Sequence, residues 1–181
     1  LYHYFRQNFS QVTNPPIDSL RENKVMSLKT RFGNLGNILD FSKLTKDNIY
    51  VLNSPILSNA QFEKFLKFFG NNNKVLDCTF SKDDDLETSI NLLKVKSEQA
   101  VREGIKQIIL SDKNISENRM PMPMLLCIGA INTHLVKLGL RGYVSINVQT
   151  GDALDTHSFA TLIVVGATTV NPYIAFDSLY Q

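Results

Sequence analysis

Polar side chains that could bind a ligand follow several apolar runs of this sequence, at the points where the runs end. Ser111-Asp112 follows the run 105–110 and precedes a polar loop. Gln149-Thr150-Gly151 and Asn171 follow later runs, and Ser81 follows an earlier one. If the runs are parallel strands, these groups gather at the carboxyl edge of the sheet, where α/β proteins commonly bind ligands. Ser111-Asp112 is the best candidate for a small-molecule site there.

Groups suited to metal binding or acid–base catalysis are scattered. His3, His134 and His157 have no carboxylate partner at metal-ligand spacing, so we interpret them as structural. Asp83-Asp84-Asp85 is interpreted as the solvated start of a helix, because no oxygen ligands follow at EF-hand spacing. No Gly-x-Ser-x-Gly motif occurs. The residues therefore predict neither a metal site nor a catalytic residue.

Cys78 and Cys127 are the only cysteines, and both lie in apolar stretches. We interpret them as buried thiols in a reduced compartment and not as a disulfide. Without a Cys-x-x-Cys spacing they are too few to hold zinc or an iron–sulfur cluster by themselves.

The length and charge of the chain exclude several classes of function. A chain of 181 residues suits one domain with a sizeable core. Its net charge of +2 provides no field that would attract nucleic acid. No apolar run approaches the ~20 residues of a membrane helix, so no membrane partner is expected. Leu1 lies in a helix-like stretch, which suggests a domain of a longer chain. A cytoplasmic location is expected, since both cysteines are interpreted as reduced thiols.

The second part of the chain, residues 74–181, has a regular pattern of short apolar runs and amphipathic stretches. We expect strands at 75–80, 105–110, 143–148 and 167–170, and helices from Asp83-Asp84-Asp85 to Gly104, at 123–138 and at 155–165. The spacing is close to the ~30 residues of a βαβ unit, which predicts an α/β fold with a parallel sheet. An open doubly wound sheet and a partial TIM-type β/α barrel would both have this pattern.

The first part, residues 1–73, is irregular and rich in Pro and Gly. Candidate helices cover 2–10, 19–30 and 59–69, the last with phenylalanines at helical spacing, and 71–73 is a polar turn. We expect 1–73 and 74–181 to be two parts of one domain.

Several segments of the sequence match one family in order. They are Tyr4-Phe5-Arg6-Gln7, the motif Gln11-Val12-Thr13-Asn14-Pro15-Pro16-Ile17-Asp18, Leu20-Arg21-Glu22, Val25-Met26-Ser27-Leu28, Ser54-Pro55-Ile56-Leu57, Ile109-Leu110-Ser111-Asp112, His134-Leu135, Gly139-Leu140-Arg141, Gly166-Ala167 and Val170-Asn171-Pro172-Tyr173-Ile174-Ala175. Together they resemble the central domain of the large chain of glutamate synthase. The family usually has Arg at the position of Lys113, several His where Asn132-Thr133-His134 stands, and an acidic residue where Gln149 stands.

The resemblance implies a place within a four-part enzyme. An amidotransferase domain releases ammonia from glutamine, and an FMN-binding domain with an iron–sulfur cluster uses it to make glutamate from 2-oxoglutarate. The central domain resembles a degenerate β/α barrel, links those two domains and forms part of the ammonia tunnel. This implies a non-catalytic domain without a cofactor of its own, in which Thr13 and Asn14 lie near the tunnel entrance.

The residues of the Thr13-Asn14-Pro15-Pro16 segment suit that role. Carbonyl and amide groups hydrogen-bond without titrating near neutrality, so they do not protonate ammonia. The two prolines fix φ and stiffen the segment. The alternatives are a rigid surface loop before a helix capped by Asp18 or Ser19, a purely structural spacer domain, or a free-standing small-molecule-binding module.

Overall fold

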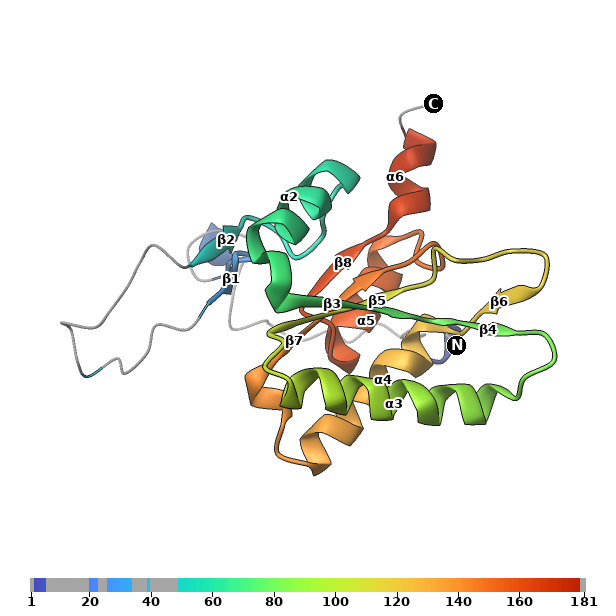
Figure 1. Ribbon diagram of the computed structural model, residues 1–181. Helices are drawn as coiled ribbons and strands as arrows, with labels where there is room; N and C mark the ends of the chain where they lie inside the picture. The colour runs from blue at the N-terminus through green and yellow to red at the C-terminus, as the bar shows by residue number, and fades with distance from the viewer. Residues whose placement is uncertain (1, 6–19, 23–25, 34–38, 40–48, 180–181) are drawn as a thin grey trace. The chain divides into compact units, whose positions relative to one another are not determined.

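The computed structural model describes residues 2–5, 20–22, 26–33, 39 and 49–179 (Figure 1). The chain forms two compact units, Gln7–Pro55 and a larger unit of Leu1–Arg6 with Ile56–Gln181. Each unit is described by itself below. The predicted division at residue 73 stays a prediction.

In the smaller unit, β1 (Thr30–Phe32) pairs antiparallel with β2 (Tyr50–Leu52). Phe32 and Leu52 are its buried side chains within these strands. The helix predicted over 19–30 was wrong at its end: residues 20–22 are helical, whereas Thr30 belongs to a strand. Pairing with a distant strand overrides the local helical spacing there.

The larger unit is built on four parallel strands, which confirms the α/β fold with a parallel sheet of βαβ units. The strands β3 (Asn73–Asp77), β5 (Gln107–Ser111), β7 (Ser145–Gln149) and β8 (Thr169–Asn171) lie side by side in that order. The crossovers contain α3 (Leu86–Arg102), α4 (Met124–Lys137) and α5 (Thr156–Val165).

The four parallel strands follow one another across the sheet in chain order. Each crossover moves one strand in the same direction, and α4 packs against both α3 and α5. Figure 1 shows α3 and α4 side by side along the sheet. Ile56 forms a parallel bridge with Val170, and the Leu57 N–H donates to the Val170 carbonyl at 2.8 Å. The sheet thus continues from β8 to Ile56 and Leu57, an arrangement that is compatible with a partial β/α barrel.

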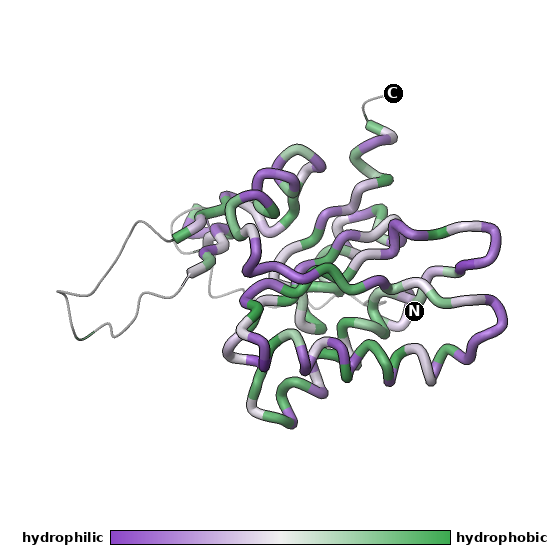
Figure 2. The backbone as a smooth tube through the Cα atoms, viewed as in Figure 1, coloured by the Kyte–Doolittle hydropathy of each residue, from purple (hydrophilic) through white to green (hydrophobic). Residues whose placement is uncertain are grey.

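The core lies between the sheet and the three crossover helices. Alternate strand residues such as Ile108, Leu110 and Val148 are fully buried and belong to one cluster with Ile128 of α4 and Leu162 of α5. Burying each of these side chains is worth about 1.5–3 kcal/mol. Figure 2 shows hydrophobic and hydrophilic residues alternating along α3, as expected of a helix with one face on this core.

Helix boundaries follow the local signals in the sequence. Asp85 caps α3 by accepting from the Thr88 N–H at 2.9 Å, and Asp155 caps α5 by accepting from Ser158 N–H at 2.7 Å. Gly104 follows α3 with φ +90°, a conformation that favours glycine. The helix α2 (Asn59–Phe69) begins at a Ser58 capping box and has the predicted bounds.

The predicted strand 75–80 is two strands. β3 ends at Asp77, and β4 (Thr79–Ser81) pairs antiparallel with β6 (Arg119–Pro121), which was not predicted. Arg119 explains the break, since its guanidinium contacts the Asp77 carboxylate at 3.1 Å and the Thr79 hydroxyl at 2.8 Å. The segment that leads into α4 therefore begins with the strand β6.

Short helical turns account for the remaining differences. Of the helix expected at 2–10, Tyr2–Phe5 form the 3-10 turn η1, and residues 6–10 lie outside the described part. The turns η4 (Gly70–Asn72) and η5 (Arg141–Tyr143) precede β3 and β7, so Asn73 belongs to a strand and β7 starts at Ser145. After β8 the chain forms α6 (Tyr173–Leu179), which was not predicted.

Candidate functional site

The polar residues at three strand ends meet as the sequence predicts. Ser111, Gln149 and Asn171 occupy matching positions in β5, β7 and β8. The Ser111 hydroxyl donates to Oε1 of Gln149 at 2.9 Å, and Nε2 of Gln149 donates to Oδ1 of Asn171 at 3.1 Å. Gln149 thus donates a bond that an acidic residue would not. Ser81 does not join them, because β4 pairs with β6.

A second polar row crosses the same strands one pleat earlier. Nδ2 of Asn147 donates to Oε1 of Gln107 at 3.0 Å, and the Thr169 hydroxyl donates to Oδ1 of Asn147 at 2.7 Å. These positions alternate with Ile108 and Leu110 and so point away from the crossover helices. We call both rows together the amide ladder; its six buried members are Gln107, Ser111, Asn147, Gln149, Thr169 and Asn171.

The amide ladder continues into two helices on the far side of β8. Nδ2 of Asn171 donates to the Leu57 carbonyl at 3.0 Å and to Oδ1 of Asn59 at 2.8 Å. Nδ2 of Asn59 in turn donates to the carboxylate of Asp177 in α6 at 2.7 Å. The ladder therefore fixes α2 and α6 to the sheet through neutral amides.

Asp112, the residue after β5, is the centre of a separate cluster. Its side chain is only 2% exposed and accepts from the Thr150 hydroxyl at 2.6 Å and from the Gly151 N–H at 3.1 and 3.2 Å. Burial raises the pKa of the Asp112 carboxyl, although hydrogen bonds from Thr150, Gly151 and Tyr173 oppose the shift. Burial and the nearby Asp112 carboxylate raise the pKa of Tyr173 to about 12. Tyr173 is therefore a protonated donor to Asp112 at neutral pH.

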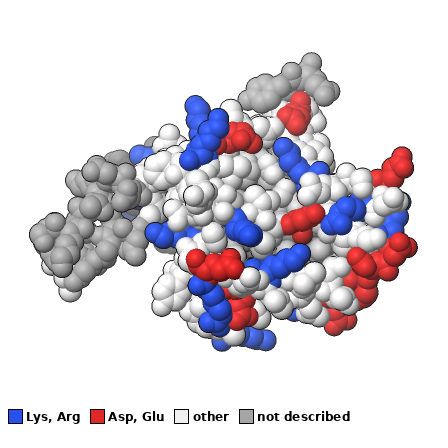
Figure 3. Space-filling model, in the orientation of Figure 1, with Lys and Arg blue, Asp and Glu red and all other residues white. Residues whose placement is uncertain are grey.

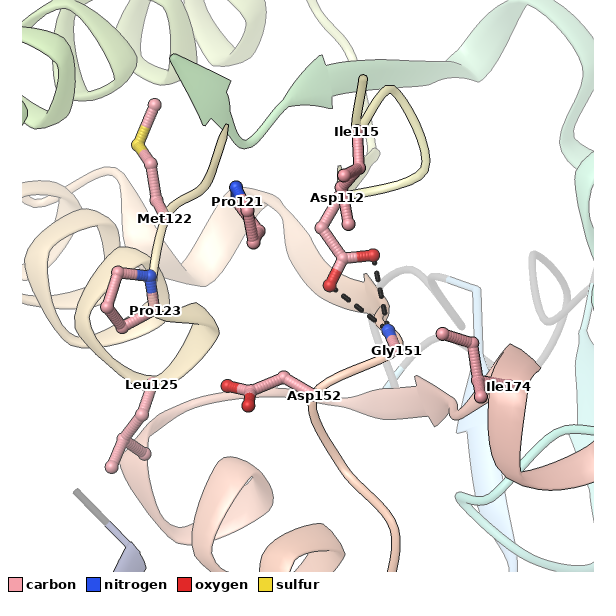
Figure 4. Close-up of a pocket in the computed structure, with 9 residues that line it drawn as sticks. All are labelled: Asp112, Ile115, Pro121, Met122, Pro123, Leu125, Gly151, Asp152 and Ile174. Carbon is pink, nitrogen blue, oxygen red and sulfur yellow. Dashed lines mark hydrogen bonds between the residues drawn. The ribbon is translucent and has the colours of Figure 1, made fainter. Parts of the chain in front are cut away.

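A cavity of about 520 Å³ opens beside this cluster (Figure 4). Two carboxylates, Asp112 and Asp152, line it together with apolar side chains. The complete lining is Asp112, Ile115, Pro121, Met122, Pro123, Leu125, Gly151, Asp152 and Ile174. Sequence reasoning found Asp112 and Gly151 from the strand ends but missed the walls, because the sequence does not show which loops close over an edge.

The other candidates lie elsewhere or outside the described part. Thr13 and Asn14 are not among the described residues, so their role stays a prediction. Nε2 of His134 lies 3.0 Å from Oε2 of Glu98 and joins α4 to α3. Cys78 and Cys127 are both buried free thiols.

The residues that the structure describes contain neither a cluster of metal ligands nor a helix suited to spanning a membrane. Among them, no three or more His, Cys, Asp or Glu side chains form a group that could hold a metal ion. Within the same residues, no helix has both the length and the apolar character to cross a membrane. Basic and acidic side chains are interspersed on the face drawn in Figure 3.

The fold is that of an α/β domain with a parallel sheet of βαβ units, and a pocket lies at the carboxyl ends of its strands. The particular family follows from comparison with known proteins. The family model for the glutamate synthase central domain matches residues 1–181, so the chain belongs to that family.

Relatives from bacteria and plants agree. The chain is 48% identical to the glutamate synthase [NADPH] large chain of Azospirillum brasilense and 40% identical to that of Bacillus subtilis, with 100% of the chain and 12% of each relative covered. It is 38% identical to the chloroplastic ferredoxin-dependent glutamate synthase of Spinacia oleracea, again over 100% of the chain and 12% of the relative. The chain thus spans about 12% of the length of these relatives.

Proposed function

We propose that this chain links the amidotransferase domain and the FMN-binding domain of a glutamate synthase large chain and borders the passage for ammonia between them. The observation that carries the proposal is the family match over residues 1–181, in relatives of which the matched segment is only 12%. In this proposal the domain is not catalytic. The FMN and the iron–sulfur cluster belong to other domains of the enzyme, which works in the cytoplasm or a plastid.

The chemistry of the chain supports a passage for a neutral molecule. Ammonia has to stay unprotonated and apart from bulk water, and amide or hydroxyl walls achieve this without exchanging protons. Thr13 and Asn14 have such groups, and Pro15 and Pro16 stiffen the segment that contains them. Elsewhere in the domain, the amide ladder places buried, neutral polar side chains in rows across the sheet.

The experiment is an Asn14→Ala substitution in the full-length enzyme. We expect glutamine hydrolysis to continue while less glutamate forms per glutamine hydrolysed, because ammonia escapes. Glutamate formation from added ammonia should stay close to that of the parent enzyme. Asn71→Ala, at an exposed position of η4, is the matched control and should leave coupling unchanged.

Unchanged coupling in Asn14→Ala would contradict a tunnel role and favour a purely structural spacer. Calorimetric titration of the isolated domain with FMN and with 2-oxoglutarate tests the alternative that the domain is a free-standing small-molecule-binding module. Tight binding of either molecule to this domain would favour that module over the linking role.

A further inference from the structure

We propose that the cavity beside Asp112 and Asp152 is a binding site for a small organic cation, with an ammonium group on a compact apolar body. The site goes beyond the linking and tunnel roles, because it lies in Ile56–Gln181 and uses none of Thr13, Asn14 or the amide ladder.

Two carboxylates, those of Asp112 and Asp152, give the cavity a negative charge. Asp112 is buried, and the donors that it accepts from are the neutral Thr150 hydroxyl, Gly151 N–H and Tyr173 hydroxyl. Neutral donors leave the negative charge of a carboxylate in place. Asp152 adds a second carboxylate, which points into the cavity in Figure 4. Among the described residues that line the cavity there is no Lys or Arg. Lys113, next to Asp112, lies over the Tyr173 ring instead, with Nζ 5.3 Å from the ring centroid. A cationic ligand in the cavity would therefore pair directly with the lining carboxylates.

The walls of the cavity are mostly apolar. Six of the lining side chains are apolar, namely Ile115, Pro121, Met122, Pro123, Leu125 and Ile174. Met122 and Leu125 are 4% and 5% exposed, so they form a fixed floor that belongs to the core cluster. Ile115 and Ile174 are partly exposed and stand at the rim. A cavity of about 520 Å³ lies within the range of small-molecule sites, and its apolar walls favour an organic body over a bare inorganic cation.

Hydrogen bonds and close packing fix the loops that hold the two carboxylates. The Asp152 N–H donates to the Thr150 hydroxyl oxygen at 3.0 Å, and that hydroxyl donates to Asp112. A Cβ on Gly151 would lie 2.4 Å from Cδ1 of Ile174, so the loop after β7 packs closely on α6. Such a preformed site costs little ordering free energy when a ligand binds. Anions such as 2-oxoglutarate or a phosphate group would be repelled by the same carboxylates.

The test uses three probes of one shape and different charge with the full-length enzyme. Cyclohexylamine is cationic at pH 7.5, cyclohexanol is neutral and cyclohexanecarboxylate is anionic. Calorimetric titration or ligand-observed NMR should show the tightest binding for cyclohexylamine, with cyclohexanol about tenfold weaker, because only the amine brings a full positive charge to the carboxylates; tenfold corresponds to about 1.4 kcal/mol. Cyclohexanecarboxylate should show no binding at this site.

Substitutions of two lining residues test whether cyclohexylamine binds in the cavity. Asp152→Asn should weaken cyclohexylamine binding about fivefold or more, and Ile115→Lys should abolish it by placing a cation at the rim. Ile115 is partly exposed on a loop, so Ile115→Lys tests the site even if a change at the buried Asp112 prevents folding. Asp84→Asn, an exposed carboxylate before α3, is the control and should bind as the parent does.

Equal binding of cyclohexylamine and cyclohexanol would overturn the proposal, as would cyclohexylamine binding that neither Asp152→Asn nor Ile115→Lys alters. Absence of cyclohexylamine binding to the parent enzyme would also overturn it. None of these results affects coupling between glutamine hydrolysis and glutamate formation, so the failure of this proposal is distinct from failure of the linking role.

Discussion

The hydroxyl of Thr150 donates a 2.6 Å hydrogen bond to Oδ2 of Asp112 and thereby joins the loop after β7 to the end of β5. The Gly151 N–H donates to both oxygens of the same carboxylate. One buried carboxylate therefore holds two neighbouring loops at the carboxyl edge of the sheet.

Thr150→Val tests how much this bond contributes. The substitution keeps the shape of the side chain but removes a donor to a buried carboxylate, which should lower the free energy of unfolding by about 1.5–3 kcal/mol. Urea denaturation of the 181-residue chain, followed by circular dichroism, measures the change. Thr156→Val, at the exposed start of α5, is the control and should cost clearly less. Equal losses of unfolding free energy in the two variants would show that the Thr150–Asp112 hydrogen bond stabilises the fold no more than an exposed threonine hydroxyl does.

Asn147→Ala tests the amide ladder. Asn147 is fully buried and satisfies both Gln107 and Thr169, so its removal leaves two buried polar groups without their partner. At about 1–3 kcal/mol for each unsatisfied group, we expect a loss of roughly 2–6 kcal/mol in the free energy of unfolding. Asn72→Ala, at an exposed position, should change it little. A loss below about 1 kcal/mol for Asn147→Ala would mean that Gln107 and Thr169 find other partners.

The crossover helices α3, α4 and α5 were predictable because their signals are local. Amphipathic spacing, a capping aspartate and a terminal glycine all lie within or next to α3, as Asp85 and Gly104 show. The short strands β4 and β6 were not predictable, since they depend on Arg119 reaching Asp77 and Thr79 across the fold. Pairing of this kind leaves no periodic pattern in segments of three residues.

Only part of the candidate site could be predicted from the sequence. The carboxyl edge of a parallel sheet is fixed by topology, so Asp112 and Gly151 followed from the strand ends. The cavity wall contributed by Ile174 was missed, because no helix was expected after the strand at 167–170, where Pro172 follows. Proline is also well tolerated at the start of a helix, and here α6 follows it directly.

Gly166→Ala should be among the most destabilising small substitutions in this chain. Gly166 has φ +135°, and a Cβ there would lie 2.7 Å from Cγ of Asn132. Asn132 accepts from Nε of Arg141 at 2.8 Å, and Nη2 of Arg141 donates to the Gly166 carbonyl at 3.0 Å. Backbone strain together with overpacking should cost about 2–4 kcal/mol, measured as a lowered urea midpoint.

Gly142→Ala is the matched control for Gly166→Ala, because a Cβ at Gly142 meets no heavy atom within 4 Å. It should leave the urea midpoint nearly unchanged. Similar midpoints for the two variants would show that the Asn132 side chain moves aside at no cost.

The two thiols should be inert while the chain is folded. A hydrogen bond with Cys127 and then burial raise the pKa of the Cys78 thiol well above its ordinary value, and both sulfurs are buried. Because the thiolate is the reactive form, Ellman's reagent should react promptly with both cysteines only in denaturant. Ser178→Cys, at an exposed position in α6, should add one fast-reacting thiol to the folded chain. Rapid reaction of Cys78 or Cys127 in the folded parent would contradict this burial.

Asp77 should make stability depend on pH in the acid range. Burial alone would raise the pKa of its carboxyl, but hydrogen bonds from Thr79 and Asn114 and the charge of Arg119 outweigh burial and hold the pKa below its ordinary value of 3.8. A carboxyl with a lowered pKa in the folded state stabilises the fold above pH 3.8, and this contribution is lost as the pH falls below that value. The side chains of Asp77 and Arg119 are 35% and 42% exposed, so solvent screening limits the effect to about 1 kcal/mol.

Urea denaturation of the parent and of Asp77→Asn at pH 6 and at pH 2.5 measures this contribution. The parent should be the more stable protein at pH 6, and the difference should shrink at pH 2.5, because the protonated carboxyl no longer pairs with Arg119. Asp84→Asn provides the control, since its carboxylate is exposed at the turn before α3. A stability difference between parent and Asp77→Asn that is the same at both pH values would show that the ionised carboxylate is not what stabilises the junction of β3, β4 and β6.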